Sequence, residues 1–269
     1  MLGSLALNLA ATMVAMLLLW RVAVAIRDVS FIDAIWAYGM VGLALLSFAL
    51  RSADGPVSLV GTHGRIVAML TTLWGVRLGT HLLVRWRRLG RDPRYDRILG
   101  GAMERRGWSF ATASLLIVFL LQGPLLWFVS LPAQVGILAG DQGTPGIAAW
   151  FGLALAILGI VFETVGDAQL EAFRKDPANK GQVMDRGLWR YTRHPNYFGD
   201  ACTWWGIWLV SAETGAGLWT VTSPLLLTWM LLKWSGAPIL EKGLKKSRPG
   251  YADYVARTSG FFPWPPRAG

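Results

Sequence analysis

The chain has 269 residues, of which 54% are hydrophobic and 15 are tryptophan, and its formal net charge is +10. The apolar residues come in long blocks rather than in the short alternations of a soluble domain, so the composition excludes an ordinary soluble enzyme and indicates a polytopic membrane protein. The charge alone would suit a nucleic-acid partner, but the basic residues fall on alternate loops between the apolar blocks, so we expect no nucleic acid.

Seven apolar runs approach the roughly 20 residues that a helix needs to cross a hydrocarbon core. Their approximate bounds are Leu2 to Ile26, Phe31 to Leu50, Ile66 to Val84, Phe110 to Leu131, Ile147 to Val165, Tyr197 to Ala212 and Leu218 to Lys233. The last two are short, which leaves open whether they form a tight hairpin joined at SAETGAG or lie partly in the interface. We expect an all-α bundle of seven transmembrane helices, since helices satisfy their own backbone hydrogen bonds in lipid.

The basic residues predict the orientation of this bundle. They concentrate in the loops after the third and fifth runs and in the C-terminal tail, whereas segments 134–146 and 211–217 contain no Lys or Arg. The positive-inside rule then places the N-terminus outside and the C-terminus in the cytoplasm. No repeat or composition break divides the chain, so we expect one domain over residues 1–269. The single cysteine, Cys202, excludes an intrachain disulfide, and no metal-binding pattern is present.

In the second run, Asp33 stands near its start, with Tyr38 close by, and Arg77 stands in the third run. Ionisable groups inside a membrane span are functional candidates by default, although a mutual ion pair would explain Asp33 and Arg77 equally well.

The loop RWRRLGRDPRYDRILG, after the third run, is the densest basic segment of the chain. Attraction to anionic lipid headgroups explains any single arginine there as well as ligand binding does. Asp92, Arg94 and Tyr95, with Arg91 just before them, are a more specific group, because an acid, a base and a phenol together can fix the polar end of a nucleotide.

A polar stripe continues the fifth run, in FETVGDAQLEAFRKD. Glu163, Asp167, Glu171 and Arg174 recur at helical spacing, so they lie on one face of a helix. Glu171 fits the solvated end of an emerging helix, whereas the two deeper acids indicate an internal cavity. Arg174 and Lys175, at the aqueous end, are candidates for holding phosphate.

The segment YTRHPNYFGD places several polar groups at the mouth of the sixth apolar run. Asn196 is suited to cap a helix that begins at Tyr197, and Asp200 lies one turn further on the same side. Arg193 and His194 lie just outside. A carboxylate at this depth costs about 3 kcal/mol unless it has a partner, which indicates a ligand or a buried pair. The tail adds Glu241, Tyr254 and Arg257 on the cytoplasmic side, without a chemistry of their own.

Two C-terminal stretches, DRGLWRYTRHPNYFGDACTWWGIWL and SGAPILEKGLKKSRPGYADYVARTSGFFPWPP, resemble the steroid 5α-reductase superfamily, in particular its bacterial branch. The stretches SFIDAIWAYG and LWGVRLGTHLLVRWRRLGRDPRYDRI resemble its N-terminal half, so the likeness covers nearly the whole chain. It implies a seven-helix bundle in the bacterial cytoplasmic membrane, with a cofactor half at roughly 147–269 and a substrate half at roughly 1–131. The implied activity is NADPH-dependent reduction of the carbon–carbon double bond of an enone lipid such as a Δ4-3-ketosteroid.

The resemblance also implies a cofactor site that opens to the cytoplasm. The family motif GLxxYxxxxNxxGE matches Gly187, Leu188, Tyr191, Asn196, Gly199 and Asp200. In the family the asparagine and the acid hold the nicotinamide carboxamide, and Asp167 and Arg174 match residues that reach the ribose and the phosphates. We expect the same site to include Arg91, Arg94, Tyr95, Lys175, Arg193, His194, Tyr197, Glu241, Tyr254 and Arg257.

The family's glutamate and tyrosine that grip the ketone have no clear match, since Trp74 stands in the place of the tyrosine and Asp33 is a replacement for the glutamate. We expect Asp33, neutral in an apolar pocket, and Tyr38 to supply the hydrogen bond that polarises the ketone. The expected substrate is a hydrophobic steroid-like or isoprenoid enone, and no obligatory protein partner is evident.

Two alternatives remain. The RHPNY motif with a C-terminal acid also resembles the isoprenylcysteine carboxyl methyltransferases, which bind S-adenosylmethionine. The many arginines favour NADPH, whose phosphates need several cations. The second alternative is a lipid transporter, whose usual signs, broken helices and inverted repeats, are not visible in the sequence.

Overall fold

The computed structural model describes residues 1–53, 55, 60–140, 143–234 and 236–267, and this part of the chain is helical, with no strand in it. Its contacts divide the chain into two compact units. The first unit contains Met1–Ala149 and Val210–Ser223, and the second contains Trp150–Leu209 and Pro224–Gly269.

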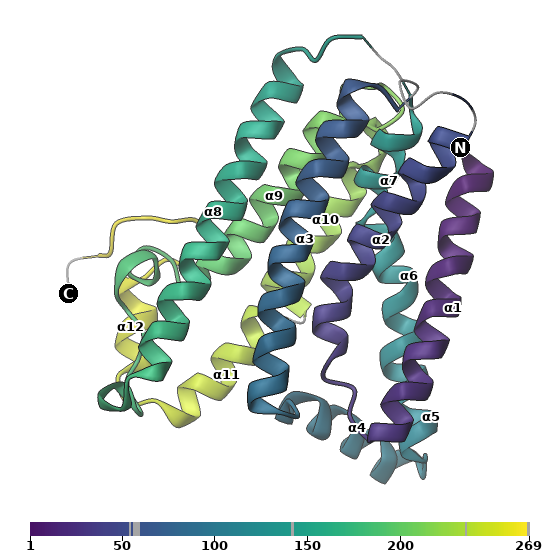
Figure 1. The fold of residues 1–269 in the computed structure, drawn as a ribbon. Coiled ribbons are helices and arrows are strands. Elements are labelled where there is room, and N and C mark those ends of the chain that lie inside the picture. The colour runs from purple at the N-terminus through teal and green to yellow at the C-terminus, as the bar shows by residue number, and fades with distance from the viewer. Residues whose placement is uncertain (54, 56–59, 141–142, 235, 268–269) are drawn as a thin grey trace. The chain divides into compact units, whose positions relative to one another are not determined.

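The first unit begins with three long helices (Figure 1), which are α1 (Leu2–Ile26), α2 (Ile32–Ala53) and α3 (Gly61–Leu89). Its shorter elements are α4 (Pro93–Arg106), α5 (Phe110–Ser114), the π-helical segment η2 (Leu115–Phe119), α6 (Leu120–Val129), α7 (Leu131–Leu138) and the 3-10 turn η5 (Leu218–Val221). Helices α2 and α3 pack closely, because a Cβ on Gly75 would lie only 2.8 Å from the carbonyl oxygen of Ala37. Helix α1 packs against α6, and α7 contacts both α2 and α3.

A buried polar network ties α1, α2 and α7 together. The Asn8 amide donates to Ser47 Oγ at 2.8 Å and to Gln134 Oε1 at 2.9 Å. The Gln134 amide in turn donates to Ser130 Oγ and to the Trp127 carbonyl. All of these side chains except Trp127 are fully buried. Hydrogen bonds between helices are one of the forces that hold membrane bundles together, so this network fixes how the three helices meet.

The loop that the sequence predicts after the third run is itself a helix, α4. Asp92 caps it by accepting a hydrogen bond from the Arg94 backbone N–H at 2.8 Å, and Pro93 occupies the first helical position. Gly107, with φ of 64°, ends it. The segment therefore carries its basic side chains on a defined scaffold rather than on a mobile loop.

The second unit is built around the long helix α8 (Ile147–Lys175) and helix α9 (Pro195–Ala212), which have most of their residues in it (Figure 1). The remaining elements are η3 (Pro177–Asn179), η4 (Gly187–Arg190), α10 (Thr222–Trp229), the π-helical segment η6 (Met230–Trp234), α11 (Ala237–Ser247) and α12 (Tyr251–Arg257).

Within the described residues, five helical segments are long and apolar enough to cross a membrane. They are Leu2–Ile26, Ile32–Ala53, Gly61–Leu89, Phe110–Val129 and Ile147–Lys175. The third and fifth extend well beyond the apolar runs, since their charged ends continue the helix. The sixth expected span corresponds to α9, with 18 residues. The seventh corresponds to a continuous helical stretch from Leu218 to Trp234, in which the 3-10 turn η5, helix α10 and the π-helical segment η6 follow one another without a gap.

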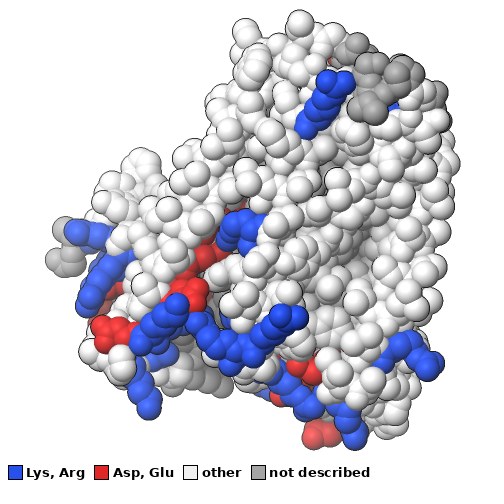
Figure 2. Space-filling model, in the orientation of Figure 1, with Lys and Arg blue, Asp and Glu red and all other residues white. Residues whose placement is uncertain are grey.

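Basic side chains gather at one end of the first unit (Figure 2). Helix α3 carries Arg65 near its beginning and Arg85, Arg87 and Arg88 in its last turns, and α4 adds further arginines. The two ends of α3 therefore differ in the number of basic residues. The positive-inside rule uses this kind of difference to predict the orientation of a span.

Candidate functional site

Helices α8 and α9 touch at a row of small residues in the second unit. A Cβ on Gly199 would lie 2.6 Å from the backbone nitrogen of Glu163 and 2.6 Å from the carbonyl oxygen of Gly159. A Cβ on Gly166 would lie 3.2 Å from the Pro195 ring and 3.5 Å from the backbone nitrogen of Asn196. Small residues let membrane helices approach to backbone contact, so the start of α9 lies directly against the polar stretch of α8.

This contact brings together the polar groups that the sequence singles out on the two helices. Glu163 and Asp167 are buried, at 3% and 9% exposure, although α8 is apolar enough to span a membrane. Asn196 and Asp200 lie one turn apart on α9 and are partly buried. These four residues thus lie on the stretches of α8 and α9 that are in contact.

The start of α9 differs slightly from the prediction. The helix begins at Pro195 rather than at Tyr197, and the His194 carbonyl accepts the Phe198 N–H at 3.0 Å. Asn196 therefore lies in the first turn, where its Oδ1 accepts the Tyr197 N–H at 3.1 Å. The cause is Pro195, whose fixed φ favours the first helical position and whose missing N–H is not needed there.

The expected phosphate ligands lie at the far end of α8. Arg174 and Lys175 are both exposed, and Lys175 Nζ lies 3.1 Å from Glu171 Oε1, in an ion pair at i,i+4 spacing. A surface pair of this kind is weak and is readily exchanged for another anion. The two cations can therefore reach a ligand in solution.

Arg193, His194 and Glu241 form a compact network in the second unit. The Arg193 Nε and the His194 Nε2 both contact Glu241 Oε1, at 2.8 and 2.9 Å. Arg193 also donates to the carbonyl oxygens of Val255 and Thr258. The hydrogen bond with His194 outweighs burial and, together with Arg193, lowers the pKa of Glu241 to about 2. The network holds α11 and the tail against the segment that leads into α9, so these side chains position that segment.

Tyr254 and Arg257 of α12 also hold this part of the chain. The Tyr254 hydroxyl donates to the Trp189 carbonyl at 2.6 Å, and burial raises the pKa of Tyr254. Arg257 forms an ion pair with Asp185. The rings of His194 and Tyr197 stack with centroids 5.2 Å apart. The Tyr254 contact is buried and holds α12 against the segment before α9, whereas the Arg257 pair lies on the surface.

A second candidate group lies in the first unit, where α4 meets the start of α2. Asp33 Oδ2 accepts a hydrogen bond from Arg94 Nη2 at 2.8 Å, and Asp33 Oδ1 accepts one from the Tyr95 hydroxyl at 2.7 Å. Arg94 also pairs with Asp92 at 2.8 Å. Burial, and then the negative charge of Asp33, raise the pKa of Tyr95 well above its usual value.

This geometry differs from the expected catalytic pair. Both oxygens of Asp33 accept hydrogen bonds, so the donors of this group are the Arg94 guanidinium and the Tyr95 hydroxyl. The structure does not bring Tyr38 to Asp33. The Tyr38 hydroxyl pairs with Thr80 Oγ1 at 2.9 Å, and its ring lies against Gly79.

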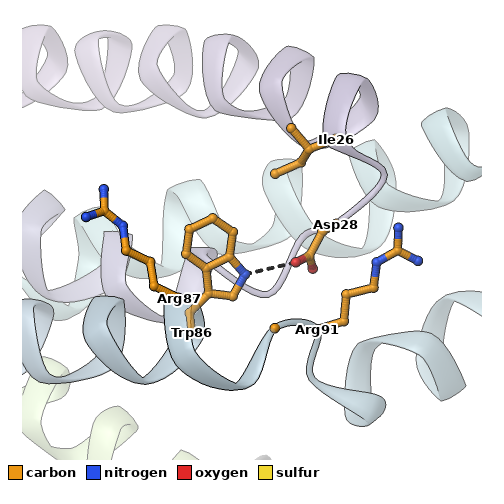
Figure 3. Close-up of a pocket in the computed structure, with 6 residues that line it drawn as sticks. Ile26, Asp28, Trp86, Arg87 and Arg91 are labelled. Atoms are coloured by element: carbon orange, nitrogen blue, oxygen red, sulfur yellow. Dashed lines mark hydrogen bonds between the residues drawn. The ribbon is translucent and has the colours of Figure 1, made fainter.

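Arg91 lies in a different place from its neighbours Arg94 and Tyr95. It lines an open pocket with Ile26, Asp28, Trp86, Arg87 and Gly90 (Figure 3). The Trp86 indole N–H donates to Asp28 Oδ2 at 2.8 Å across this pocket. Sequence reasoning assigned no role to Asp28 or Trp86, and the only available signal was a carboxylate directly after the first span.

Two further supports were missed. Gln169 accepts the Leu188 N–H at 2.9 Å, and Trp189 donates to the Gly166 carbonyl at 2.9 Å, so both attach the segment before α9 to α8. Gln169 follows Asp167 by two positions and therefore lies off the predicted stripe. Its amide is uncharged, so nothing in the sequence marked Gln169 as a polar contact of α8.

Comparisons with known proteins give a relative and a family for this chain. A relative from Schizosaccharomyces pombe (strain 972 / ATCC 24843), "Uncharacterized protein C594.04c", is 24% identical over 91% of this chain and 75% of its own length. No solved structure matches the chain. The family model "Protein of unknown function (DUF1295)" matches residues 19–258. The chain therefore belongs to the DUF1295 family, which is linked to the steroid 5α-reductase superfamily.

Proposed function

We propose that this protein is an NADPH-dependent reductase of the carbon–carbon double bond of an enone lipid, most directly a Δ4-3-ketosteroid or an isoprenoid enone. The observation that carries the proposal is the pair of buried carboxylates, Glu163 and Asp167, at the contact with the helix that bears Asn196 and Asp200. Buried acids inside a span indicate a polar ligand or a functional network, and a scaffold protein has no need of them.

The donor set of the second unit fits NADPH. The Asn196 amide can donate to and accept from the nicotinamide carboxamide, and the Asp200 carboxylate can accept its N–H. Asp167 suits a ribose hydroxyl. Arg174, by its planar fork, and Lys175, as a point charge, suit the phosphates. S-adenosylmethionine carries no phosphate, so these two cations at the exposed end of α8 favour NADPH.

When bound, NADPH would supply a hydride to the β-carbon of the enone and become NADP⁺, and the α-carbon of the resulting enolate would take up a proton from water. Without substrate, the single hydrogen of the Tyr95 hydroxyl is donated to Asp33 Oδ1, and Arg94 holds Asp33 in place. In the proposed reaction the ketone oxygen replaces Asp33 as the acceptor of this hydrogen, which stabilises the enolate that develops. The raised pKa of Tyr95 keeps the phenol protonated at neutral pH. This assignment replaces the expected pair of Asp33 and Tyr38.

The proposal includes the finer topology. We place seven spans in the bacterial cytoplasmic membrane, with α9 as the sixth and the segment from Leu218 to Trp234 as the seventh. The arginines at the end of α3 and in α4 then face the cytoplasm, where NADPH is available. Cysteine accessibility at Ser52→Cys and Ser109→Cys tests this orientation: the first should react only from outside and the second only from inside.

The test of cofactor binding is calorimetric titration of the detergent-purified protein with NADPH, NADH and S-adenosylmethionine. Asn196→Ala and Arg174→Ala should each weaken NADPH binding at least about tenfold, because each removes a hydrogen-bond partner of a charged or buried group. Arg186→Ala is the matched control, since it removes one exposed arginine of the same unit and should leave binding unchanged. Binding of S-adenosylmethionine instead would reassign the protein to the methyltransferases.

A further inference from the structure

The open pocket of the first unit lies where a membrane span ends. Ile26 is the last residue of α1, and Trp86 and Arg87 belong to the last turn of α3 (Figure 3). Ile26 is 44% exposed and gives the pocket an apolar edge on the span side. Tryptophan and arginine at the end of a span lie at the level of the lipid headgroups. The pocket therefore faces the layer in which phospholipid phosphates are found.

The arginines of this region divide into two kinds. Arg85 pairs with Asp92 at 3.6 Å, and Arg94 pairs with both Asp33 and Asp92. By contrast, the described residues contain no hydrogen-bond partner for the guanidinium groups of Arg87 and Arg91. These two arginines line the same pocket from either side of Gly90, whose φ of 72° turns the chain so that Arg91 comes beside Asp28.

The single negative charge of Asp28 does not balance the two positive charges of Arg87 and Arg91. Burial would raise its pKa, but hydrogen bonds from Ser30 and Trp86 outweigh burial and lower it, so it is ionised at neutral pH. Each of its oxygens already accepts a hydrogen bond, Oδ1 from the Ser30 N–H and Oδ2 from Trp86. Two guanidinium groups against one occupied carboxylate leave the pocket with an excess of positive charge and two donor forks.

We infer that this pocket binds the phosphate of an anionic membrane phospholipid, with Arg91 on the phosphate, Arg87 adding positive charge from the other side of Trp86 (Figure 3), and Ile26 and Trp86 beside the upper part of the acyl chains. A lipid is favoured over a soluble anion because the apolar edge adjoins a membrane span. An anionic headgroup is favoured over a zwitterionic one because Asp28 has little capacity left for an ammonium group. This site is independent of the proposed reductase activity.

The test is native mass spectrometry of the full-length protein, equilibrated with phosphatidylglycerol or phosphatidylcholine, with the number of retained lipids as the readout. The wild type should retain phosphatidylglycerol in preference. The double substitution Arg87→Gln and Arg91→Gln should weaken retention about 25-fold, since each basic residue at a membrane surface contributes about a fivefold gain in affinity. The matched control is Lys242→Gln with Lys245→Gln, which removes two exposed charges elsewhere and should leave retention near the wild-type level.

A variant with the opposite effect separates binding from folding. Asp28→Asn removes the negative charge of the pocket and should tighten phosphatidylglycerol retention about fivefold, which a damaged protein would not do. The arginines at the end of α3 also complement the helix dipole, but that role would produce no lipid selectivity. Equal retention of both lipids, an equal loss in the lysine control, or displacement of the lipid by inorganic phosphate or NADPH at millimolar concentration would overturn the inference.

Discussion

The contact between α8 and α9 makes a sharp prediction for Gly199. Replacing it by alanine adds a Cβ that would lie 2.6 Å from the Glu163 nitrogen and the Gly159 carbonyl oxygen, about 0.8 Å closer than an ordinary contact of 3.4 Å. The obstructing atoms are backbone, so no side chain can rotate away and the two helices must separate. The variant Gly199→Ala therefore changes the spacing of the groups that we assign to the cofactor.

The expected cost follows from this geometry. Overpacking of a tight contact costs about 1–3 kcal/mol. Alanine also gains up to about 1 kcal/mol of helix propensity over glycine, which partly hides that cost. Gly243→Ala in α11 is the matched control, because its Cβ would meet nothing within 4 Å and it gains the same propensity. Comparing the two variants cancels the propensity gain and leaves a difference of about 1–3 kcal/mol.

The assay is reversible unfolding in mixed micelles, followed by tryptophan fluorescence, together with NADPH titration of both variants. Gly199→Ala should unfold at lower denaturant concentration than Gly243→Ala and should bind NADPH at least about tenfold more weakly. Equal stability and equal binding in the two variants would refute the close contact and the place of the cofactor site beside it.

Three further outcomes follow from the network and from the second group. The pKa of Glu241 in the folded protein, about 2, lies below its ordinary value of 4.5, so its stabilisation is present above pH 4.5 and is lost as the pH falls towards 2. The unfolding midpoint of the wild type, measured by fluorescence, should therefore fall between pH 4.5 and pH 2. In Glu241→Gln, where His194 has no charged acceptor, this fall should be smaller. Tyr254→Phe should lower the unfolding free energy by about 1–3 kcal/mol in denaturant titrations, because it leaves a buried carbonyl oxygen without its donor. Tyr95→Phe should lower the turnover of an enone about 100-fold in an NADPH oxidation assay, whereas Tyr38→Phe should change it less than about threefold. A larger loss in Tyr38→Phe than in Tyr95→Phe would show that Asp33 and Tyr38 polarise the ketone, as the sequence predicts.

The sequence predicts local features of this fold well. The five spans follow from the length and composition of the apolar runs, because a hydrocarbon core sets both. Helical spacing predicted a polar stripe with Glu163 and Asp167 beside an internal cavity; both residues are buried, and the cavity stays a prediction. The start of α9 was misplaced by two residues, since the preference of Pro195 for the first helical position was given too little weight.

Partnerships between distant segments could not be predicted. Asp33 and Arg94 are 61 positions apart, and His194 and Glu241 are 47 apart. One sequence contains no signal for such pairs, because any of the many arginines satisfies the charge requirement of Asp33 equally well. For the same reason the sequence does not place Tyr95, 62 positions further along the chain, beside Asp33.

The most direct test of the reductase proposal is transfer of deuterium from NADPH deuterated at C4 of the nicotinamide to a lipid enone by the purified protein in nanodiscs. With progesterone or an isoprenoid enone as the probe, the proposal predicts a saturated ketone that carries one deuterium, and no such product with Asn196→Ala. A protein that binds no NADPH and transfers no deuterium to either probe, while methylating a lipid from S-adenosylmethionine, would contradict it.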